Sequence, residues 1–239
     1  VALTEVAAPL AVRRTVAFAS AVWDGAVEVE GVWGRRCALD DVAALVPPLD
    51  HVAVVVDPAG ALVARWRPDV VVDARLLKRP GATSVTAAPL VVSLGPGAVC
   101  GQDAHVVIET QRGHDLGRVL ETGSALPNTG VPAPIAGVAE ERVLRAPGVG
   151  AVRGVRTIGD RVAAGDLVAW VGAAPVYTAI AGVVRGLLRD GIVATPGLKL
   201  GDVDPRGDVR ACFTLSDKTR TLSGGVLESI LRRFPLVGP

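Results

Sequence analysis

Cysteines, aromatic residues and unbalanced charge are all scarce in this 239-residue sequence. The formal net charge of +1 provides no cationic excess for binding nucleic acid or an anionic membrane, so neither is expected as a partner. No apolar run reaches the roughly 20 residues of a membrane span, and no signal peptide is visible. Three distant cysteines, Cys37, Cys100 and Cys212, favour reduced thiols in the cytoplasm over a disulfide framework.

Hydrophobic residues make up half of the chain, which excludes disorder and predicts one large or two small domains. The chain starts without methionine, and Val1 to Leu3 has the character of a strand that is already ending. A valine start codon read literally and a fragment boundary both fit this beginning.

The N-terminal part predicts a mixture of helices and strands. Pro9 introduces a helical pattern over 10–22, and Gly25 is expected to end it. The alternating residues 26–30 and the returning residues 32–39 predict a hairpin that turns at Gly31. A short helix is expected to follow, capped by Asp40 or Asp41 and extending through Val46.

Four apolar runs rich in valine, at 51–56, 69–73, 90–94 and 105–110, are typical of parallel strands that are covered on both faces. Together they predict a Rossmann-like sheet, in which ligands bind outside the carboxyl ends of the strands. That rule points to Asp57, Asp73, Arg75, Lys78, Gly95, Gly97 and Cys100, of which Asp73, Arg75, Lys78, Gly95 and Gly97 are the candidate cofactor-binding residues. For each one alone, a solvated loop residue or a salt-bridge partner is the competing interpretation.

Residues 90–130 hold two of the three histidines among acids, amides and glycines, which favours a site there. His105 and Glu109 share one face of the expected strand, but about 13 Å separates them, so they do not both ligate one ion. The expected local pairs are His105 with Asp103, and Glu109 with Arg112 and His114. The candidate catalytic residues are Cys100, His105, Glu109 and His114. For His114 the competing interpretation is that it only stabilises a turn, but the density of charged groups around it favours a site.

Metal binding is not expected, because the sequence contains no HxH, HExxH or CxxC spacing. Proline-rich residues 123–137 predict a linker or a long functional loop.

An internal repeat follows, in which glycines at 150, 154, 159 and 165 recur 32 residues later at 182, 186, 191 and 197. Duplicated short strands with glycine turns predict two interlocking halves of one small β-domain, similar to the biotinyl/lipoyl-type barrel-sandwich domain. The hairpin expected between the halves, 172–175, has no lysine, so covalent biotin or lipoate is not expected. Lys199 is the only lysine between Ala146 and Pro205, and it lies in the second half.

The last predicted element is a helix over 226–233, with Val226, Leu227, Ile230, Leu231 and Phe234 as its core-facing stripe.

The predicted domain organisation is an N-terminally incomplete Rossmann-like domain (1–139), a barrel-sandwich β-domain (140–205) and a C-terminal tail and helix (206–239). The fold class is therefore α/β with an additional all-β domain.

Several motifs together resemble one family, the selenium-dependent molybdenum hydroxylase system proteins (YqeB family). They cover nearly the whole chain and are PLAVRRTVAF (9–18), DVVVDARLLKR (69–79), LGPG (94–97), ETQRGHDLGRV (109–119), PNTG (127–130), ERVLRAP (141–147), LGDVDPRGD (200–208) and SDK (216–218). Members of that family begin earlier, with a strand, a glycine-rich loop and a helix, so the resemblance implies that this chain is a fragment. Cys100 departs from the family pattern, which counts against a sulfur- or selenium-carrying role.

The resemblance implies an accessory protein that helps to mature molybdenum hydroxylases and binds a nucleotide or a molybdopterin-type cofactor. Its partners would be a molybdenum hydroxylase or its maturation machinery. Phosphates would contact backbone N–H groups and Arg13, Arg14, Arg75, Lys78 or Arg112. An enzyme that depends on a nucleotide or transfers sulfur or selenium, with Cys100 as nucleophile and His105 or His114 as base, is the alternative. A structural adaptor that docks through its β-domain is a third hypothesis.

Overall fold

The computed structural model describes residues 1–44, 50–79 and 83–236, and the chain forms two compact units from interleaved segments. Unit 1 combines Val1–Ala59 with Val131–Leu215, and unit 2 combines Gly60–Gly130 with Ser216–Pro239. The predicted domain boundaries follow chain order, whereas these units do not. The mixed α/β class is confirmed, and no helix in the described residues is long and apolar enough to span a bilayer.

The first sheet of unit 1 has the strand order β1-β4-β3-β2. β4 pairs in parallel with both β1 and β3, while β2 and β3 form the predicted antiparallel hairpin. Glu30 and Gly31 both have positive φ, as a two-residue type I′ turn requires. The strands are β1 (Ala2–Glu5), β2 (Ala26–Val29), β3 (Val32–Cys37) and β4 (Val52–Val56).

The continuous helix predicted over 10–22 is wrong. Two 3₁₀ turns, η1 (Arg14–Val16) and η2 (Phe18–Ser20), are separated by the extended residue Ala17 and followed by the single turn α1 (Ala21–Asp24). Before them, the Val12 carbonyl accepts a hydrogen bond from the Leu187 N–H, so tertiary pairing replaces a helical bond. Of the next predicted helix, α2 (Leu39–Ala44) is present, and its expected end at Val46 lies outside the described residues.

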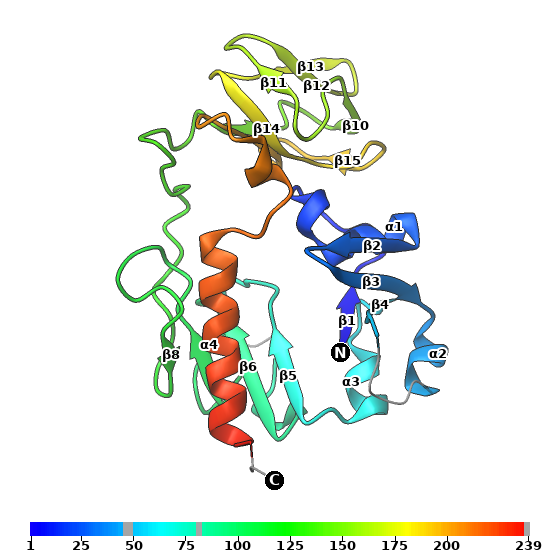
Figure 1. Cartoon of the computed structure of the whole chain (residues 1–239), viewed down its shortest axis with the longest axis vertical. Helices are drawn as coiled ribbons and strands as arrows, with labels where there is room; N and C mark the ends of the chain where they lie inside the picture. Colours follow the sequence, from blue (N-terminus) through cyan, green and yellow to red (C-terminus); the bar gives the residue numbers. More distant parts are fainter. Residues whose placement is uncertain (45–49, 80–82, 237–239) are drawn as a thin grey trace. The chain divides into compact units, whose positions relative to one another are not determined.

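The internal repeat is confirmed as two sets of four strands. β9 (Val143–Arg145), β10 (Gly150–Gly154), β11 (Arg161–Val162) and β12 (Leu167–Val171) make the first set. The second set is β13 (Ala174–Tyr177), β14 (Gly182–Leu187), β15 (Val193–Ala194) and β16 (Lys199–Asp204). The two sheets, β13-β12-β10-β15 and β11-β14-β16-β9, each take two strands from each set, so the halves interlock around one apolar core (Figure 1). The short turn η4 (Val209–Cys212) follows.

Unit 2 contains the sheet β5-β6-β7-β8, in which β5, β6 and β7 are parallel and β8 is antiparallel. The prediction of one Rossmann-like sheet from all four valine-rich runs is therefore wrong. β4 uses both of its edges to pair with β1 and β3, which leaves no edge for β5. The elements of unit 2 are α3 (Ala61–Trp66), β5 (Val70–Asp73), η3 (Val85–Ala87), β6 (Leu90–Leu94), β7 (Val106–Ile108), β8 (Val119–Leu120) and α4 (Asp217–Arg233). Residues 121–142 contain no helix or strand, as predicted for a linker, apart from an isolated bridge between Ile135 and Val138.

Helix α4 begins nine residues earlier than predicted and lies along the sheet of unit 2 (Figure 1). The Ser216 hydroxyl caps it by accepting the Thr219 N–H. A Cβ on Gly225 would come within 2.5 Å of the Gly117 carbonyl oxygen, so glycine here permits close packing rather than ending the helix.

The core-facing stripe of α4 is only partly as predicted. Leu222, Val226 and Ile230 pack in a cluster with Leu90, Val92 and Ile108. Leu227, Leu231 and Phe234 are instead 56%, 38% and 37% exposed, because the register that buries Leu222 and Gly225 turns them outward.

Candidate functional site

The loops that follow the three parallel strands of unit 2 lie at one edge of the sheet. We call this the carboxyl edge, formed by residues 74–79 after β5, 95–97 after β6 and 109–115 after β7. Parallel strands bring their carboxyl ends to the same side, which is where ligands bind in open α/β sheets. Most of the predicted site residues fall here.

Asp73 anchors the first of these loops. Its buried carboxylate accepts hydrogen bonds from the Arg75 backbone N–H, from Arg75 Nε and Nη2 at 2.9 and 2.6 Å, and from the Thr83 hydroxyl. Burial acts to raise the pKa of Asp73, but the hydrogen bonds from Arg75 and Thr83 outweigh it and hold the pKa below its usual value. Asp73 and Arg75 thus satisfy each other and shape the loop that leads to Lys78.

The two predicted cofactor-binding glycines allow loops to approach each other closely. A Cβ on Gly97 would lie 2.5 Å from Leu77 Cβ and 2.6 Å from the Leu77 carbonyl oxygen. Gly95 has a φ of +85° and packs against the Thr110 side chain. Their small size therefore fixes the position of the loop that carries Lys78.

Glu109 is 3% exposed, and its two carboxylate oxygens accept three backbone N–H groups. Oε1 receives the N–H groups of Thr110 and Gln111, both at 2.7 Å, and Oε2 receives that of Leu126 at 2.8 Å. A carboxylate held in this way shapes the loops around it. The sequence predicted Glu109 as a catalytic residue. In the structure its contacts are those of a side chain that holds neighbouring loops in position.

Three cationic side chains from distant segments occupy the carboxyl edge. Lys78 Nζ donates to Asn128 Oδ1 at 2.9 Å, and Arg112 forms two hydrogen bonds with Asp217, of 2.6 and 2.9 Å. Lys218, in the first turn of α4, is half-buried. Burial, and then the charges of Arg112 and Lys78, lower the pKa of Lys218, so the field of both neighbours reaches its ammonium group.

Sequence reasoning missed Lys218, Asp217 and Asn128 as members of this site. They lie in motifs that it did record, SDK and PNTG, but nothing in their spacing places them beside Arg112 or Lys78. Contact across 105 residues between Arg112 and Asp217 is a product of the fold.

The remaining catalytic candidates do not converge. Cys100 packs in the apolar core, donates to the Leu120 carbonyl oxygen at 3.2 Å, and has its pKa raised by burial, so it is a thiol at neutral pH. His105 precedes β7, at the opposite end of that strand from Glu109, and its Nδ1 accepts the Val91 N–H. The expected partner of His105, Asp103, instead accepts the Val99 N–H. His114 is exposed, and no side-chain partner is seen for it among the described residues.

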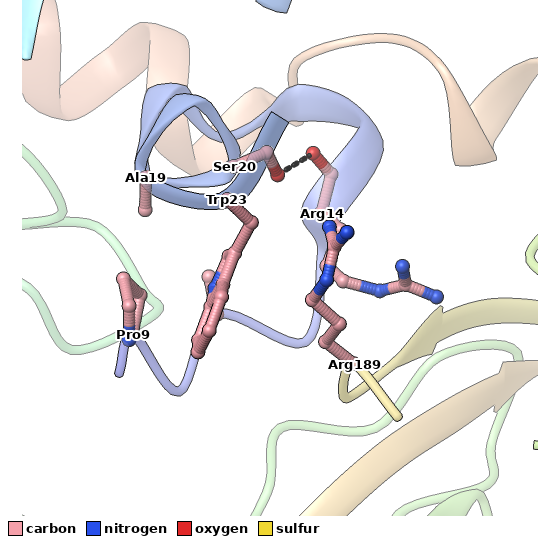
Figure 2. Close-up of a pocket in the computed structure, with 7 residues that line it drawn as sticks. Pro9, Arg14, Ala19, Ser20, Trp23 and Arg189 are labelled. Atoms are coloured by element: carbon pink, nitrogen blue, oxygen red, sulfur yellow. Dashed lines mark hydrogen bonds between the residues drawn. The ribbon is translucent and has the colours of Figure 1, made fainter. Parts of the chain in front are cut away.

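Arg13 and Arg14 belong to unit 1 and bind its backbone. Arg13 Nη2 donates to the carbonyl oxygens of Ala211 and Thr214, and Arg14 Nε donates to that of Leu187 at 2.7 Å. Arg14 also lines a cavity of about 10 Å³ beside Trp23 and Arg189 (Figure 2), which has room for no more than a water molecule. These contacts give both arginines a structural role, and a phosphate group does not fit the cavity.

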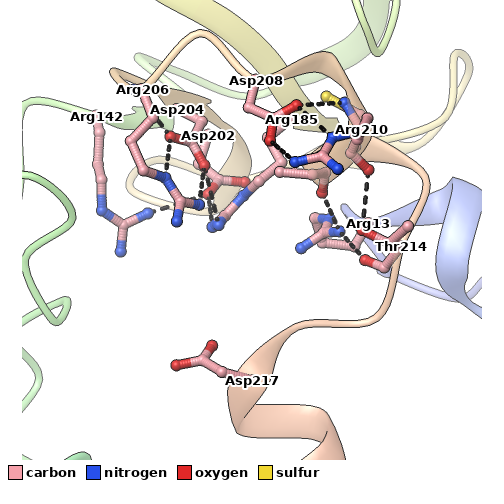
Figure 3. Close-up of polar contacts among 12 residues, drawn as sticks. Arg13, Arg142, Arg185, Asp202, Asp204, Arg206, Asp208, Arg210, Thr214 and Asp217 are labelled. Carbon is pink, nitrogen blue, oxygen red and sulfur yellow. Dashed lines mark hydrogen bonds and ion pairs between the residues drawn. The ribbon is translucent and has the colours of Figure 1, made fainter.

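Unit 1 also contains a buried network of alternating charge that the sequence did not reveal (Figure 3). Asp202 and Asp204 are fully buried, and Arg185 pairs with both. Arg142 adds a second partner for Asp202, and Arg206 adds a second for Asp204. The network ties β14 to β16 and to the residue that leads into β9.

No group of three or more His, Cys, Asp or Glu side chains in the described ranges could hold a metal ion. All three cysteines are free.

Comparison with known proteins gives one relative of clear similarity. No protein-family model matches the chain. The chain is 44% identical over 231 residues to the uncharacterized protein YqeB of Escherichia coli (strain K12), covering 97% of this chain and 43% of that protein. It therefore spans less than half the length of this curated relative. The similarity confirms the YqeB part of the predicted resemblance, and the name of the relative states no function.

A solved structure, the product-bound ectoine utilization protein EutE (DoeB) from Ruegeria pomeroyi, is similar over 36% of this chain and 27% of that one. The sequence identity is 23% and the TM-score is 0.25.

Proposed function

We propose that this chain is part of an accessory factor that matures selenium-dependent molybdenum hydroxylases in the cytoplasm, with its carboxyl edge holding a phosphate-bearing cofactor. The cofactor class is a nucleotide or a molybdopterin-type molecule, and the protein partner is the hydroxylase or its maturation machinery. In this proposal, the sheet of unit 2 is the Rossmann-like part, and the duplicated strands of unit 1 are a biotinyl/lipoyl-like domain without the carrier lysine.

One observation carries the proposal: motifs shared with the resembling family supply residues that meet at one edge of one sheet. Packing explains the meeting of their apolar and glycine residues, but it gives no reason for cationic side chains to gather there. Charged donors at the carboxyl ends of parallel strands are the usual arrangement for binding phosphate. The residues and their motifs are Lys78 (LLKR), Gly97 (LGPG), Arg112 (QRGHD), Asn128 (PNTG), and Asp217 with Lys218 (SDK).

The enzyme alternative has less support. A sulfur- or selenium-transferring reaction needs a thiolate nucleophile next to a base. Cys100 instead has a raised pKa and donates to a backbone carbonyl, while His105 and His114 lie at opposite ends of the β7 segment.

A deletion strain tests the proposal. The full-length protein carrying Lys218→Ala should fail to restore hydroxylase activity and cyanide-labile selenium in that strain. Arg233→Ala, at the far end of the same helix, should restore both. If deletion leaves the hydroxylase active, the maturation role is wrong. If folded Lys218→Ala restores it fully, the cofactor is bound elsewhere.

A further inference from the structure

We infer that Lys218, Lys78 and Arg112 form a seat for a terminal phosphate group, and that Lys218 is the residue whose hydrogen bonding this phosphate completes. The inference rests on the proposed function for the location of the site. It goes further by naming the chemical group that the carboxyl edge recognises and the residue that contacts it.

The position of Lys218 is electrostatically unfavourable without an anion. It is the second residue of the 17-residue helix α4, where the partial positive charge of the helix end favours acidic side chains. Burial, and then the charges of Arg112 and Lys78, lower the pKa of Lys218 and outweigh the opposite effect of Glu109 and Asp217. A bound anion would offset these repulsions and accept hydrogen bonds from the ammonium group.

The charged groups at the edge leave a net positive charge that suits an anion. Arg112 is neutralised by its two hydrogen bonds with Asp217, and the buried Glu109 is held by backbone N–H groups. The partner of Lys78 is the neutral amide of Asn128, and in the described parts of the chain Lys218 has no hydrogen-bond partner. Three cations (Lys78, Arg112 and Lys218) against two carboxylates (Glu109 and Asp217) leave one net positive charge, and the two ammonium groups can donate to separate oxygens of one phosphate.

The cationic groups are also held in place before any ligand arrives. Asn128 and Asp217 fix the head groups of Lys78 and Arg112. The loop after β7 packs directly on the first turns of α4, because a Cβ on Gly117 would lie 2.6 Å from the Thr221 side chain. Preorganisation of this kind reduces the entropic cost of binding.

Calorimetry with the 239-residue chain and adenosine monophosphate, at pH 8 and constant ionic strength, tests the seat directly. Adenosine, which lacks the phosphate, is the matched ligand control and should not bind. Lys218→Gln should lower the affinity about tenfold or more, as expected for loss of a charge-assisted contact. Lys218→Arg should retain most of the affinity, and Arg233→Gln should leave it within about twofold because it lies outside the first turn of the helix.

Lysine acetylation read by peptide mass spectrometry gives a second measurement that does not depend on variants. Inorganic phosphate should protect Lys218 and Lys78, while chloride at equal ionic strength should not. Unchanged labelling of Lys218 together with equal affinity of the Lys218→Gln variant would overturn the inference. A third outcome is that adenosine monophosphate binds and phosphate protects Lys218, but a strain that lacks the protein keeps active hydroxylases. The phosphate seat would then stand and the maturation role would be wrong.

Discussion

Single carboxylates at the carboxyl edge act mainly by arranging loops. Glu109 gathers three backbone N–H groups from two separate stretches, 110–111 and 126. Glu109→Gln replaces one accepting oxygen with a donating amide, so at least one of these N–H groups loses its partner. We expect a loss of about 1–3 kcal/mol in the free energy of unfolding, measured by urea denaturation.

His114→Ala is the matched control for Glu109→Gln, because His114 is exposed on the same loop. Its free energy of unfolding should stay within about 0.5 kcal/mol of the parent value. A stable Glu109→Gln variant that fails only in hydroxylase maturation would contradict the positioning role and return Glu109 to the catalytic candidates.

Asp73 predicts a specific pH dependence of stability. Its pKa in the folded chain lies below its ordinary value of 3.8, so it stabilises the fold above that value, and the contribution disappears as the pH falls through the folded pKa. The difference in unfolding free energy between the parent and Asp73→Asn should thus be largest at neutral pH. It should shrink toward zero as the pH falls below about 4. A pH-independent difference for Asp73→Asn would refute the assignment.

Residue types and local motifs identified much of the carboxyl edge but not the function of each residue. Lys78, Arg112 and both glycines were selected by their place after buried strands. Whether a glycine approaches a ligand or a neighbouring loop is not encoded locally, and Gly97 turns out to contact Leu77. Lys218 could not be found from spacing, because only the packing of α4 brings it to the edge.

Helix α4 shows how adjacent glycines have opposite effects within one element. A Cβ on Gly224 would meet nothing within 4 Å, whereas one on Gly225 would meet the Gly117 carbonyl oxygen at 2.5 Å. Gly224→Ala should therefore stabilise the protein by about 0.5–1 kcal/mol through the unfolded chain. Gly225→Ala should destabilise it by about 1–3 kcal/mol through overpacking.

Thermal and urea denaturation of the two single variants measure this contrast under identical conditions. Equal effects of both substitutions would mean that α4 does not pack on Gly117 in solution. The same glycine pair explains why the helix start was predicted too late: glycines signal helix ends only when packing does not require them inside the helix.

Strands were predicted better than helices at the element scale because valine-rich runs and turn glycines are strong local signals. The duplicated strands of unit 1 follow from glycines 32 residues apart. The segment 10–22 has helical spacing, but its backbone pairs with β14 through Val12, and a tertiary contact of this kind leaves no local signal.

The order of segments along the chain does not determine which unit they join, since each unit is assembled from two separate segments. β4 and β5 are adjacent in sequence and similar in composition, yet they belong to different units because the edges of β4 are already paired. Pairing partners are a global choice that valine content does not specify.

Unit 2 therefore depends on a helix that the 85 residues of 131–215 separate from its other segment. Leu222, Val226 and Ile230 of α4 cover Leu90 and Ile108 of the sheet. A chain ending at Leu215 lacks this cover, and we expect the amides of β6 and β7 to lose protection in hydrogen exchange. Unit 1 keeps all of its own segments, so the amides of β10, β12, β14 and β16 should stay protected.

Leu222→Ala in the complete chain provides the milder form of the same test, because it leaves every backbone contact of α4 in place. It should cost about 2–5 kcal/mol, the range for a buried leucine, and should raise exchange in β6 and β7 ahead of β14 and β16. If truncation at Leu215 exposes both units equally, the two fold as one cooperative body. If it exposes neither, α4 is dispensable for the sheet, and the cationic carboxyl edge would have to form without Lys218.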